Sequence, residues 1–580
     1  MKSLFKIFTI LTPEKRRKSL FLLIMMTIGA MLEALGIASI MPLLSIMGDE
    51  TFLQKNPSIL KLVSIFGIDD QKQFSIFFAG VLIFVYIIKN LYLAIQSKIQ
   101  IKFTMNLEAK YSSELMDTYL NKSYLFHLSH NSAQILRDVA SGAQTAFRNI
   151  LLPTLNLLTE AITVFGIWIF LVFVDPLTAI GAAGILGFLS ILLLKLLRKK
   201  ISKKGELNSK LQIDVNKWIN QGVGAIKETK VLRREKYFSY SFRNAYKEYT
   251  NANSSFQFLN SIPRFIIEFI VVFGLLLLII IKLILNQPIN QIVTLLGVLA
   301  LAAFRLMPSV TRIINYANMI KFQMPLFNEL YNEFIQIRDR IQKKETISFA
   351  NTDKRLVFNK NIEIKNLTFS YNDEEQPVIK NISFEIPKGS FVGIVGTSGA
   401  GKTTFVDILL GLLKPSNGEV FVDGIDIFKN IRSWQADLSY VPQSIYLIDG
   451  TIRENIAIGI DSTNIDDQRI QEVLEMSELS SFISTLPNGI ETEVGERGVR
   501  LSGGQKQRIG IARALYQMPE VLVLDEATSA LDNETEKSIM NTILKLKGKI
   551  TIISIAHRLS TLDGCDFKIK FESGISKIEK

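Results

Sequence analysis

A glycine-rich loop in the last third of the chain has the spacing of a phosphate-binding motif. The apolar strand FVGIVG leads into Gly-x-x-x-x-Gly-Lys-Thr, residues 396–403, and the stretch TTFVDILLGLL then has the pattern of a helix. In such a strand–loop–helix unit, backbone N–H groups and the helix N-terminus wrap a nucleotide phosphate. We therefore predict nucleotide binding by Gly396, Thr397, Ser398, Gly399, Ala400, Gly401, Lys402, Thr403 and Thr404.

Two side chains of this loop have expected roles in the chemistry. The Lys402 ammonium would reach the β- and γ-phosphates of ATP, and the Thr403 hydroxyl would bind Mg²⁺. Every class of P-loop enzyme shares this motif, so the reaction has to be read from other residues. The alternative is a glycine-rich turn without a ligand, and the flanking strand and helix argue against it.

Two adjacent carboxylates follow a second apolar strand. The string VLVLDEATSALD, residues 521–532, ends its apolar run at Asp525 and Glu526. One carboxylate can fix a metal shell while the other accepts a proton from an attacking water. We expect Asp525 to hold Mg²⁺ and Glu526 to act as the general base. The alternative is that Glu526 is only a solvated acid after a strand.

Two further strings flank these carboxylates. LSGGQKQRIGIARAL, residues 501–515, precedes them, and TIISIAHRLST, with His557, follows them. In number and order these motifs resemble the ABC ATPase family, so an α/β P-loop ABC ATPase domain is expected. The resemblance implies that His557 contacts the γ-phosphate and that four signature residues contact ATP bound by a partner subunit. These are Ser502, Gly503, Gly504 and Gln505.

The same resemblance assigns two residues outside these strings. Gln443, in YVPQSIYLIDGTIRENI, matches the glutamine that senses Mg²⁺ and the transport domain, and Tyr371, in FSY, matches the aromatic that stacks on adenine. A purely structural role is the alternative for His557. The expected catalytic set is Glu526, His557, Gln443 and Lys402, and the expected Mg²⁺ set is Thr403, Gln443 and Asp525.

The first half of the chain has the composition of a polytopic α-helical membrane domain. Hydrophobic residues make up 48% of the sequence and the mean hydropathy is +0.25, with most of the apolar excess before residue 320. Six apolar stretches reach the roughly 20 residues that cross a bilayer core. They are Leu20–Met47, Phe74–Ile95, Leu151–Val174, Leu177–Leu197, Ile262–Leu285 and Gln291–Ile314.

Lys and Arg predict the orientation of these spans. Residues 1–18 contain six of them, whereas the first loop, 48–73, contains three against four acids, and residues 198–248 contain fourteen against five acids. By the positive-inside rule, the N-terminus and the ATPase domain face the cytoplasm of a multi-pass protein in the cell (inner) membrane. Glu33 and the length of the first apolar run argue against a cleaved signal peptide.

Two long loops, 96–150 and 198–261, keep helical spacing of apolar and polar residues, so we expect the spans to continue as cytoplasmic helices. Their middle parts, near His127 and Lys227, resemble the coupling segments of ABC exporters, with an ordinary turn as the alternative. The whole chain thus resembles an ABC exporter half-transporter. The resemblance implies a dimer, and the intact motifs favour a homodimer over a heterodimer with a related half.

Net charge and cysteine content restrict the kinds of partner and bound group that we expect. The net charge of +12 is concentrated beside apolar segments, which indicates anionic membrane lipids and no nucleic acid as partner. The single cysteine, Cys565, excludes an intrachain disulfide, and no Cys/His spacing fits zinc. The stretch NPSILKLVSIFGI after the first span has the periodicity of a short surface helix, with ordinary packing as the alternative.

Charged residues within the spans are costly unless they face a cavity. We expect Lys89, Arg264, Arg305 and Arg312 to line a substrate cavity toward the cytoplasmic side. Arg305 and Arg312 are seven positions apart, so they share a helix face about 10 Å apart along the axis and can meet one extended headgroup. The alternatives are snorkelling to lipid headgroups and a local pair of Arg264 with Glu268.

The strings LEALGIASIMPLL and FRLMPSVTRI resemble the bacterial flippases of lipid-linked oligosaccharides used in protein N-glycosylation. That resemblance implies a pyrophosphate-lipid-linked glycan as the substrate. The alternatives are export of another amphiphile such as a lipid, peptide or drug, an ATP-gated channel, and a non-transport ABC ATPase. The expected domains are a cytoplasmic segment at 1–19, the membrane domain at 20–335, a linker at 336–360 and the ABC ATPase domain at 361–580.

Overall fold

The computed structural model describes residues 2–39, 71–174, 176–285, 289–343, 355–372, 376–527, 532–556, 562 and 564–579. The chain divides into two compact units. The first contains Met1–Lys122 and Ser129–Ile347, and the second contains Ser123–Leu128 and Ser348–Lys580. The surface helix expected after the first span and His557 both lie outside the described residues.

The described part of the first unit is helical. Long helices form because their apolar runs continue into more polar stretches without a residue pattern that ends a helix. The helices are α1 (Lys2–Thr9), α2 (Pro13–Ala38), α6 (Gln71–Leu120), α8 (Ser132–Ala146), η1 (Phe147–Leu151), α9 (Leu152–Val174), α10 (Pro176–Gly224), α11 (Ile226–Val231), α12 (Glu235–Ile284), α13 (Ile289–Glu329) and α14 (Tyr331–Lys343). All but the last residue of the short helix α7 (Tyr124–Ser129) belong to the second unit.

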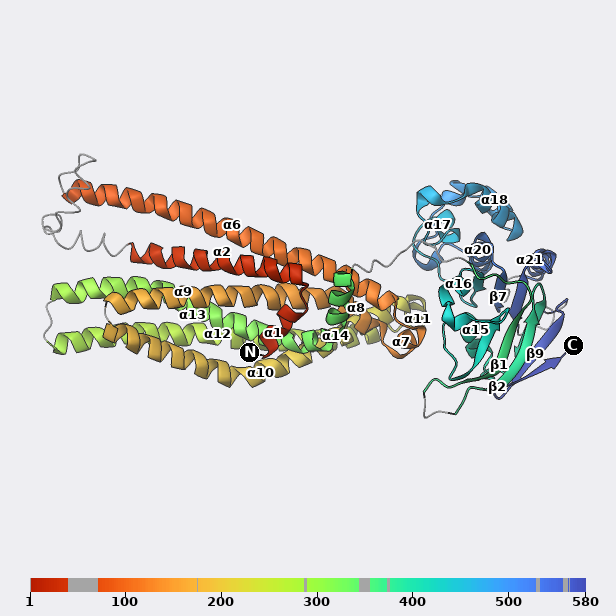
Figure 1. Ribbon diagram of the computed structural model, residues 1–580, viewed down its shortest axis with the longest axis horizontal. Coiled ribbons are helices and arrows are strands. Elements are labelled where there is room, and N and C mark those ends of the chain that lie inside the picture. The colour runs from red at the N-terminus through yellow and green to blue at the C-terminus, as the bar shows by residue number, and fades with distance from the viewer. Residues whose placement is uncertain are drawn as a thin grey trace. The chain divides into compact units, whose positions relative to one another are not determined.

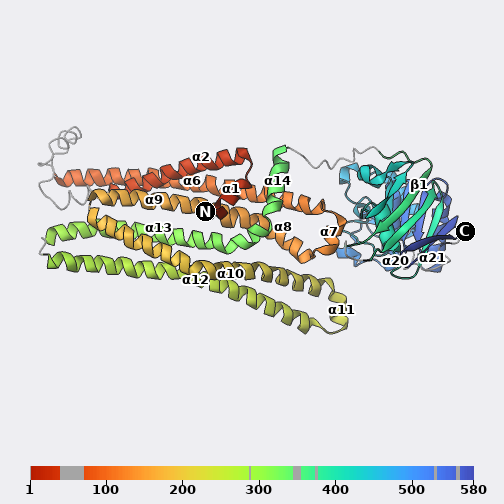
Figure 2. The same ribbon diagram turned by 60° about the horizontal axis from the view of Figure 1, so that its bottom comes forward.

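The long helices of the first unit lie alongside one another (Figures 1 and 2). Helix α10 packs against α12 and α13, and α9 packs against α2 and α13. Large apolar side chains such as Phe173, Phe188 and Phe269 stay exposed, as expected for surfaces that face lipid rather than water. The short helix α11 joins the ends of α10 and α12.

Five described helices are long and apolar enough to cross a membrane. They contain the first five expected spans, although α2 ends at Ala38 and the remainder of the first span lies outside the described residues. The sixth span falls within α13, where the side chains before residue 300 are not described. The prediction that helices extend beyond the spans is confirmed, because α6, α10 and α12 continue well beyond their apolar stretches. The cytoplasmic location of these extensions stays a prediction.

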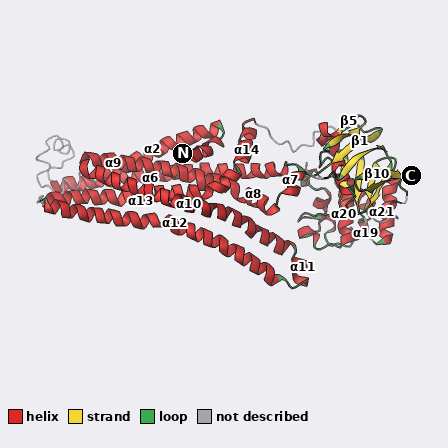
Figure 3. Ribbon diagram, turned by 90° about the horizontal axis from the view of Figure 1, so that it is seen from below, coloured by secondary structure: helices red, strands yellow, loops and turns green. Residues whose placement is uncertain are grey.

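The second unit contains two sheets (Figure 3). The antiparallel sheet has the order β2-β1-β4-β5, and the larger sheet has the order β10-β9-β3-β8-β7-β6, with β9, β3, β8, β7 and β6 parallel. The strands are β1 (Asn361–Phe369), β2 (Ile379–Pro387), β3 (Phe391–Gly396), β4 (Asn417–Val422), β5 (Ile425–Asp426), β6 (Leu438–Val441), β7 (Val521–Asp525), β8 (Thr551–Ile555), β9 (Phe567–Glu572) and β10 (Ile575–Glu579).

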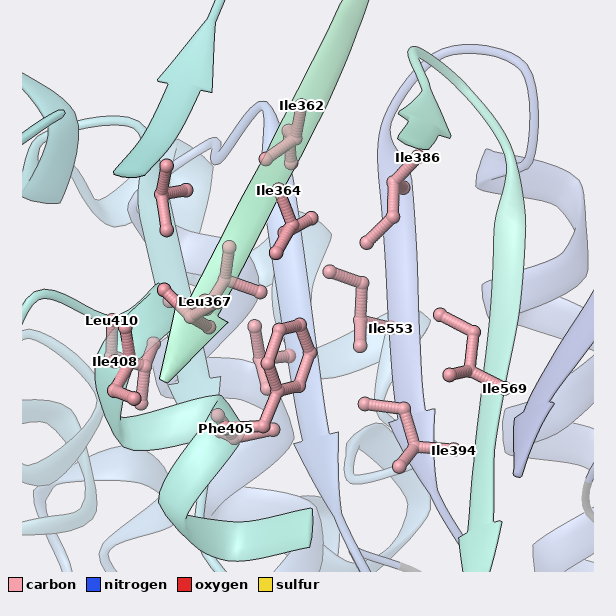
Figure 4. Packing of buried hydrophobic residues seen from close by; sticks show 14 of the residues in the cluster. Ile362, Ile364, Leu367, Ile386, Ile394, Phe405, Ile408, Leu410, Ile553 and Ile569 are labelled. Carbon is pink, nitrogen blue, oxygen red and sulfur yellow. The ribbon is translucent and has the colours of Figure 1, made fainter. Parts of the chain in front are cut away.

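A hydrophobic core joins the two sheets to the helix that follows the glycine-rich loop (Figure 4). Ile362 and Ile364 come from β1, Ile394 and Ile553 come from the parallel sheet, and Phe405 comes from α15. All five side chains are essentially excluded from solvent. Their burial fixes α15, and therefore the start of the loop's helix, against the strands.

The remaining helices of the second unit carry the signature segment. Helix α20 packs against α17 and α18, away from the antiparallel sheet. The helices and short 3₁₀ turns are α15 (Lys402–Leu409), η2 (Ile427–Lys429), α16 (Ile431–Gln435), α17 (Ile452–Ile456), η3 (Ser462–Asn464), α18 (Asp467–Met476), α19 (Ser480–Ser484), η4 (Gly489–Glu491), η5 (Glu496–Gly498), α20 (Gly503–Tyr516) and α21 (Asn533–Leu546).

Candidate functional site

Neighbouring parallel strands end at one edge of the larger sheet and carry most of the predicted residues. Ile555, at the end of β8, pairs with Ile394 of β3 on one side and with Asp525 of β7 on the other. The end of β6, at Val441, is paired with β7 and precedes Gln443 by two residues. Carboxyl ends of parallel strands are where ligands bind in open α/β sheets.

The glycine-rich loop between β3 and α15 needs glycine at two positions. Gly396 has φ +148°, and a Cβ there would collide with the carbonyl oxygen of Phe571 on β9. Gly401 has φ +101° at the N-cap of α15. A side chain would be strained at both positions, so glycine permits the backbone to turn tightly into the helix.

Lys402 is 8% exposed and folds back over this loop. Its Nζ donates hydrogen bonds to the carbonyl oxygens of Gly396, at 2.8 Å, and Thr397, at 2.9 Å. Both acceptors are neutral, so they orient the ammonium without cancelling its charge. The positive charge is therefore held where a phosphate in the loop would meet it.

Tyr371 lies next to the beginning of α15. Its hydroxyl and that of Thr404 are 3.1 Å apart and share a hydrogen bond, and its ring meets Phe369 edge-on with centroids 5.0 Å apart. The tyrosine ring is thus fixed beside the loop, as an aromatic that stacks on a nucleotide base requires.

Asp525 shares its surroundings with two residues that the sequence did not single out. The Tyr440 hydroxyl, on β6, donates to the Asp525 carboxylate at 3.2 Å. Burial, together with the Asp525 carboxylate nearby, raises the pKa of Asp407 on α15 to about 6. The end of β7 is therefore a region of concentrated negative potential, which favours a cation.

Glu526 directly follows β7 with a left-handed backbone, φ +50°. Its N–H donates to the carbonyl oxygen of Ile555 at 3.0 Å, and its carboxylate accepts a hydrogen bond of 2.7 Å from Nε2 of Gln443. A non-glycine residue in this conformation is uncommon and tends to occur at functional sites. The structure therefore brings together Gln443 and Glu526, which lie 83 positions apart.

The four signature residues begin helix α20. Ser502 caps the helix by accepting from the Gln505 N–H at 3.3 Å, and the Gln505 side chain accepts from the Ser502 N–H at 2.8 Å. Ser502 and Gly503 are exposed. Because these two residues are exposed, an anion can approach the N-terminus of the helix. Among the described residues, no hydrogen bond joins this segment to the glycine-rich loop of the same chain.

The residues present suit Mg²⁺. No cluster of three or more His, Cys, Asp or Glu side chains is placed to hold a metal ion within the described part of the chain. Mg²⁺ does not require such a cage, because it is usually bound by one or two carboxylates, hydroxyls and nucleotide phosphates. The Thr403 hydroxyl, the Asp525 carboxylate and the Gln443 amide oxygen would supply that set, and the ion would neutralise charge on the phosphates.

The charged residues of the membrane half have separate surroundings. Arg312 on α13 forms a two-point ion pair with Glu160 on α9, with Nε–Oε1 2.6 Å and Nη2–Oε2 3.1 Å. The Lys89 ammonium lies 4.1 Å from the ring centroid of Tyr86. Arg264 is exposed, and the side chain of Arg305 lies outside the described set.

Comparisons with known protein families give a match in both halves of the chain. A family description of the ABC transporter transmembrane region matches residues 18–308, half of the chain, and one of the ABC transporter matches residues 379–529. Among solved structures, a bacterial Atm1-family ABC exporter with ATP bound aligns with a TM-score of 0.73 and 22% identity, over 96% of this chain and 95% of that chain. The likeness shows that the fold is shared.

Two relatives match a shorter stretch. An export ATP-binding/permease protein of Rickettsia typhi is 43% identical over 216 residues, 37% of this chain and 37% of that protein. An ATP-dependent lipid A-core flippase of Saccharophagus degradans is 44% identical over 214 residues, 37% of this chain and 36% of that protein. These alignments span little more than a third of each relative. The description that covers half the chain does decide the family: the chain belongs to the ABC transporters and joins a helical membrane domain to an ABC-type ATPase domain.

Proposed function

We propose that the protein is an exporter that couples ATP hydrolysis to movement of an amphiphile across the inner membrane. The observation that carries the proposal is the 2.7 Å hydrogen bond from Gln443 to Glu526 at the edge of the sheet that also carries the glycine-rich loop. This bond orients the carboxylate beside the expected metal ligands. Glu526 accepts a proton from the attacking water, and Lys402 stabilises charge on the phosphates.

Hydrolysis requires two copies of the chain in this proposal. Ser502–Gln505 of one copy faces the ATP held by Lys402 and the glycine-rich loop of the other, because the open end of α20 offers N–H groups to a phosphate. Two equivalent sites then form in a symmetric homodimer. The N-terminus and both ATPase domains lie on the cytoplasmic side, as the excess of Lys and Arg in the flanking segments favours.

The proposed substrate is a lipid-linked oligosaccharide. Support comes from the motif resemblance in the first and last spans and from a relative named as an ATP-dependent lipid A-core flippase. A pyrophosphate and a sugar cannot cross bare hydrocarbon quickly, since each charge costs at least about 3 kcal/mol at the bilayer centre. Lys89, Arg264, Arg305 and Arg312 remain our proposed lining of the cavity that lowers this barrier.

Reconstitution into liposomes tests the proposal. Movement of a labelled polyprenyl-pyrophosphate sugar is measured with ATP and Mg²⁺, beside a labelled phospholipid and a lipophilic drug. We expect ATP-dependent movement of the lipid-linked sugar above the other two. Movement of only the phospholipid or drug would assign another amphiphile, whereas hydrolysis with no movement and an ionic conductance would point to an ATP-gated channel.

A further inference from the structure

An open cavity of about 510 Å³ lies between helices α10 and α13. Its lining is strongly cationic, with five basic side chains, one hydroxyl and one carboxylate. The lining residues are Lys195, Arg198, Lys199, Ser202, Lys203, Glu206 and Lys321. Neither the ATP site nor the expected substrate cavity uses any of these residues.

Close packing of the two helices builds this cavity. Leu197 and Ile201 of α10 pack with Phe322 of α13 in a small buried cluster. One turn further, the backbones approach so closely that a Cβ at Gly205 would collide with the carbonyl oxygen of Phe322. The approach holds Lys321, the residue before Phe322, against the basic face of α10.

No described part of the protein neutralises the charges of the cavity. Within the described ranges, none of the five cations forms an ion pair, and the single acid, Glu206, does not pair with any of them. Clustered like charges repel one another and create a positive potential. An anion in the cavity would relieve this repulsion, so the lining is suited to binding one.

The position of the cavity indicates the source of that anion. Along α10 the large exposed side chains are apolar from Ile180 to Leu192, and exposed basic side chains begin at Lys195 and continue at Arg198 and Lys199. This change marks the edge of the hydrocarbon layer, where lipid headgroups lie. From Lys195 to Glu206 the lining extends roughly 16 Å along the helix axis, enough to cross the headgroup layer.

We propose that this cavity binds the phosphate headgroup of an anionic phospholipid from the leaflet on the ATPase side. Basic pockets between membrane helices on the cytoplasmic side recognise such headgroups. A lipid with two phosphates binds most tightly, because cations from both α10 and α13 can then each meet a phosphate. This site is independent of the transported substrate, and its lipid would act as a resident ligand.

Native mass spectrometry of the purified full-length protein in detergent tests the site. The protein is titrated with cardiolipin, phosphatidylglycerol, phosphatidylcholine and inorganic phosphate, and the affinity for the first bound lipid is measured. We expect affinity to fall in the order cardiolipin, phosphatidylglycerol, phosphatidylcholine. Displacement of cardiolipin by equimolar inorganic phosphate would instead assign a free-phosphate site and overturn the proposal.

Matched variants separate the cavity from general surface charge. Lys203→Gln with Lys321→Gln should weaken cardiolipin binding roughly tenfold or more, since each basic residue near an anionic surface contributes measurably. The control, Lys200→Gln with Lys210→Gln, removes two exposed charges from α10 outside the cavity and should change affinity less than about threefold. Glu206→Gln should strengthen binding. Equal losses in the cavity and control pairs, or no gain with Glu206→Gln, would overturn the proposal.

Discussion

Two cations, one in each half of the molecule, are held by different kinds of partner. In the ATPase domain, Lys402 donates to the carbonyl oxygens of Gly396 and Thr397, which are neutral. In the membrane domain, Arg312 is held by the carboxylate of Glu160 at 2.6 Å. Lys402 is therefore positioned with its charge available, whereas the charge of Arg312 is already compensated.

The difference separates charges that act on a ligand from charges that hold the fold. An oriented, uncompensated cation can stabilise a phosphate directly, whereas a paired cation must first give up its partner. The same contrast applies to acids, because the Glu526 carboxylate accepts a hydrogen bond from the neutral amide of Gln443, whereas the Glu160 carboxylate accepts one from a guanidinium. Substitutions of these residues should therefore impair ligand chemistry in the ATPase domain and folding stability in the membrane domain.

The largest effect is expected from Glu526→Gln in the ATPase domain. Loss of the proton acceptor should lower steady-state ATP hydrolysis by roughly 10²–10⁴-fold, while the phosphate-binding loop still binds ATP. Hydrolysis and equilibrium nucleotide binding are measured on the same preparation. Glu475→Gln, at an exposed acid on α18, is the control and should hydrolyse ATP normally. Near-normal turnover by Glu526→Gln would remove it as the general base.

The next largest effect concerns composite sites. Lys402→Ala in one subunit and Ser502→Arg in the other leave one site with both defects and one site with neither, so about half of the activity should remain. With both changes in the same subunit, each site carries one defect and activity should fall much further. Tagged mixed dimers purified through both tags provide the comparison. Equal activity of the two arrangements would contradict composite sites.

Substitution of the cations in the membrane domain should reduce transport without a matching change in ATP hydrolysis. Arg305→Ala with Arg312→Ala is expected to reduce movement of the lipid-linked sugar while basal ATP hydrolysis persists. Because Glu160 already compensates the charge of Arg312, a second variant removes both charges of the pair together. In Glu160→Gln with Arg312→Gln, a transport defect at normal protein stability would show that the charge of Arg312 acts on substrate. Unchanged movement in the Arg305–Arg312 variant would refute headgroup recognition by these residues.

A smaller effect on stability follows from the pair itself. Arg312→Ala should leave the Glu160 carboxylate without its partner and destabilise the membrane domain. The Arg312 side chain is 36% exposed, so solvent screens part of the loss. We expect about 1–3 kcal/mol rather than the roughly 3–5 kcal/mol of a fully buried pair. Glu160→Gln with Arg312→Gln should recover most of the unfolding midpoint in detergent. A double variant no more stable than Arg312→Ala would exclude the pair as a stabilising contact.

Much of the fold could be predicted from local patterns in the sequence. The strand–loop–helix around Lys402 and the two carboxylates at the end of β7 could be predicted because each depends on neighbouring residues. Contacts between distant residues could not. The Gln443–Glu526 bond joins positions 83 apart, and the Arg312–Glu160 pair joins positions 152 apart. Helical spacing suggested only local partners, such as Glu268 for Arg264, and among the described residues that pair is not formed.

The expected linker also shows that composition alone can miss a short helix. Residues 336–343 were expected in the linker, yet they belong to α14, and Phe334 and Ile337 of that helix are buried. Two apolar positions in a charged stretch are a weak signal, because a single helical turn can bury both once a partner surface exists. Tyr440 and Asp407 were missed for the same reason, since their proximity to Asp525 depends on how β6 and α15 pack.

The smallest expected effect concerns Asp437, a buried acid in the ATPase domain. Its ion pair among the described residues is longer than the pair between Arg312 and Glu160. Asp437 is fully buried, and Arg355 Nε lies 3.7 Å from its Oδ1. Burial raises the pKa of Asp437 to about 6, against the ordinary 3.8. The folded domain therefore holds the proton more tightly than the unfolded chain. The resulting stabilisation is complete below pH 3.8 and is lost as the pH rises through about 6.

Comparison of variants across pH isolates this contribution of Asp437. Between about pH 5 and pH 7.5, the free energy of unfolding of the parent protein should fall by roughly 1 kcal/mol relative to that of Asp437→Asn. This corresponds to about 2–4 °C in the unfolding midpoint of the ATPase domain. Asp423→Asn is the control. Despite partial burial, backbone N–H groups of Asn359, Lys360 and Asn361 lower the pKa of Asp423, so its stabilisation is lost only in more acidic solution. That variant should be destabilised equally at both pH values, and a pH-independent difference for Asp437→Asn as well would mean that burial imposes no cost on its carboxylate.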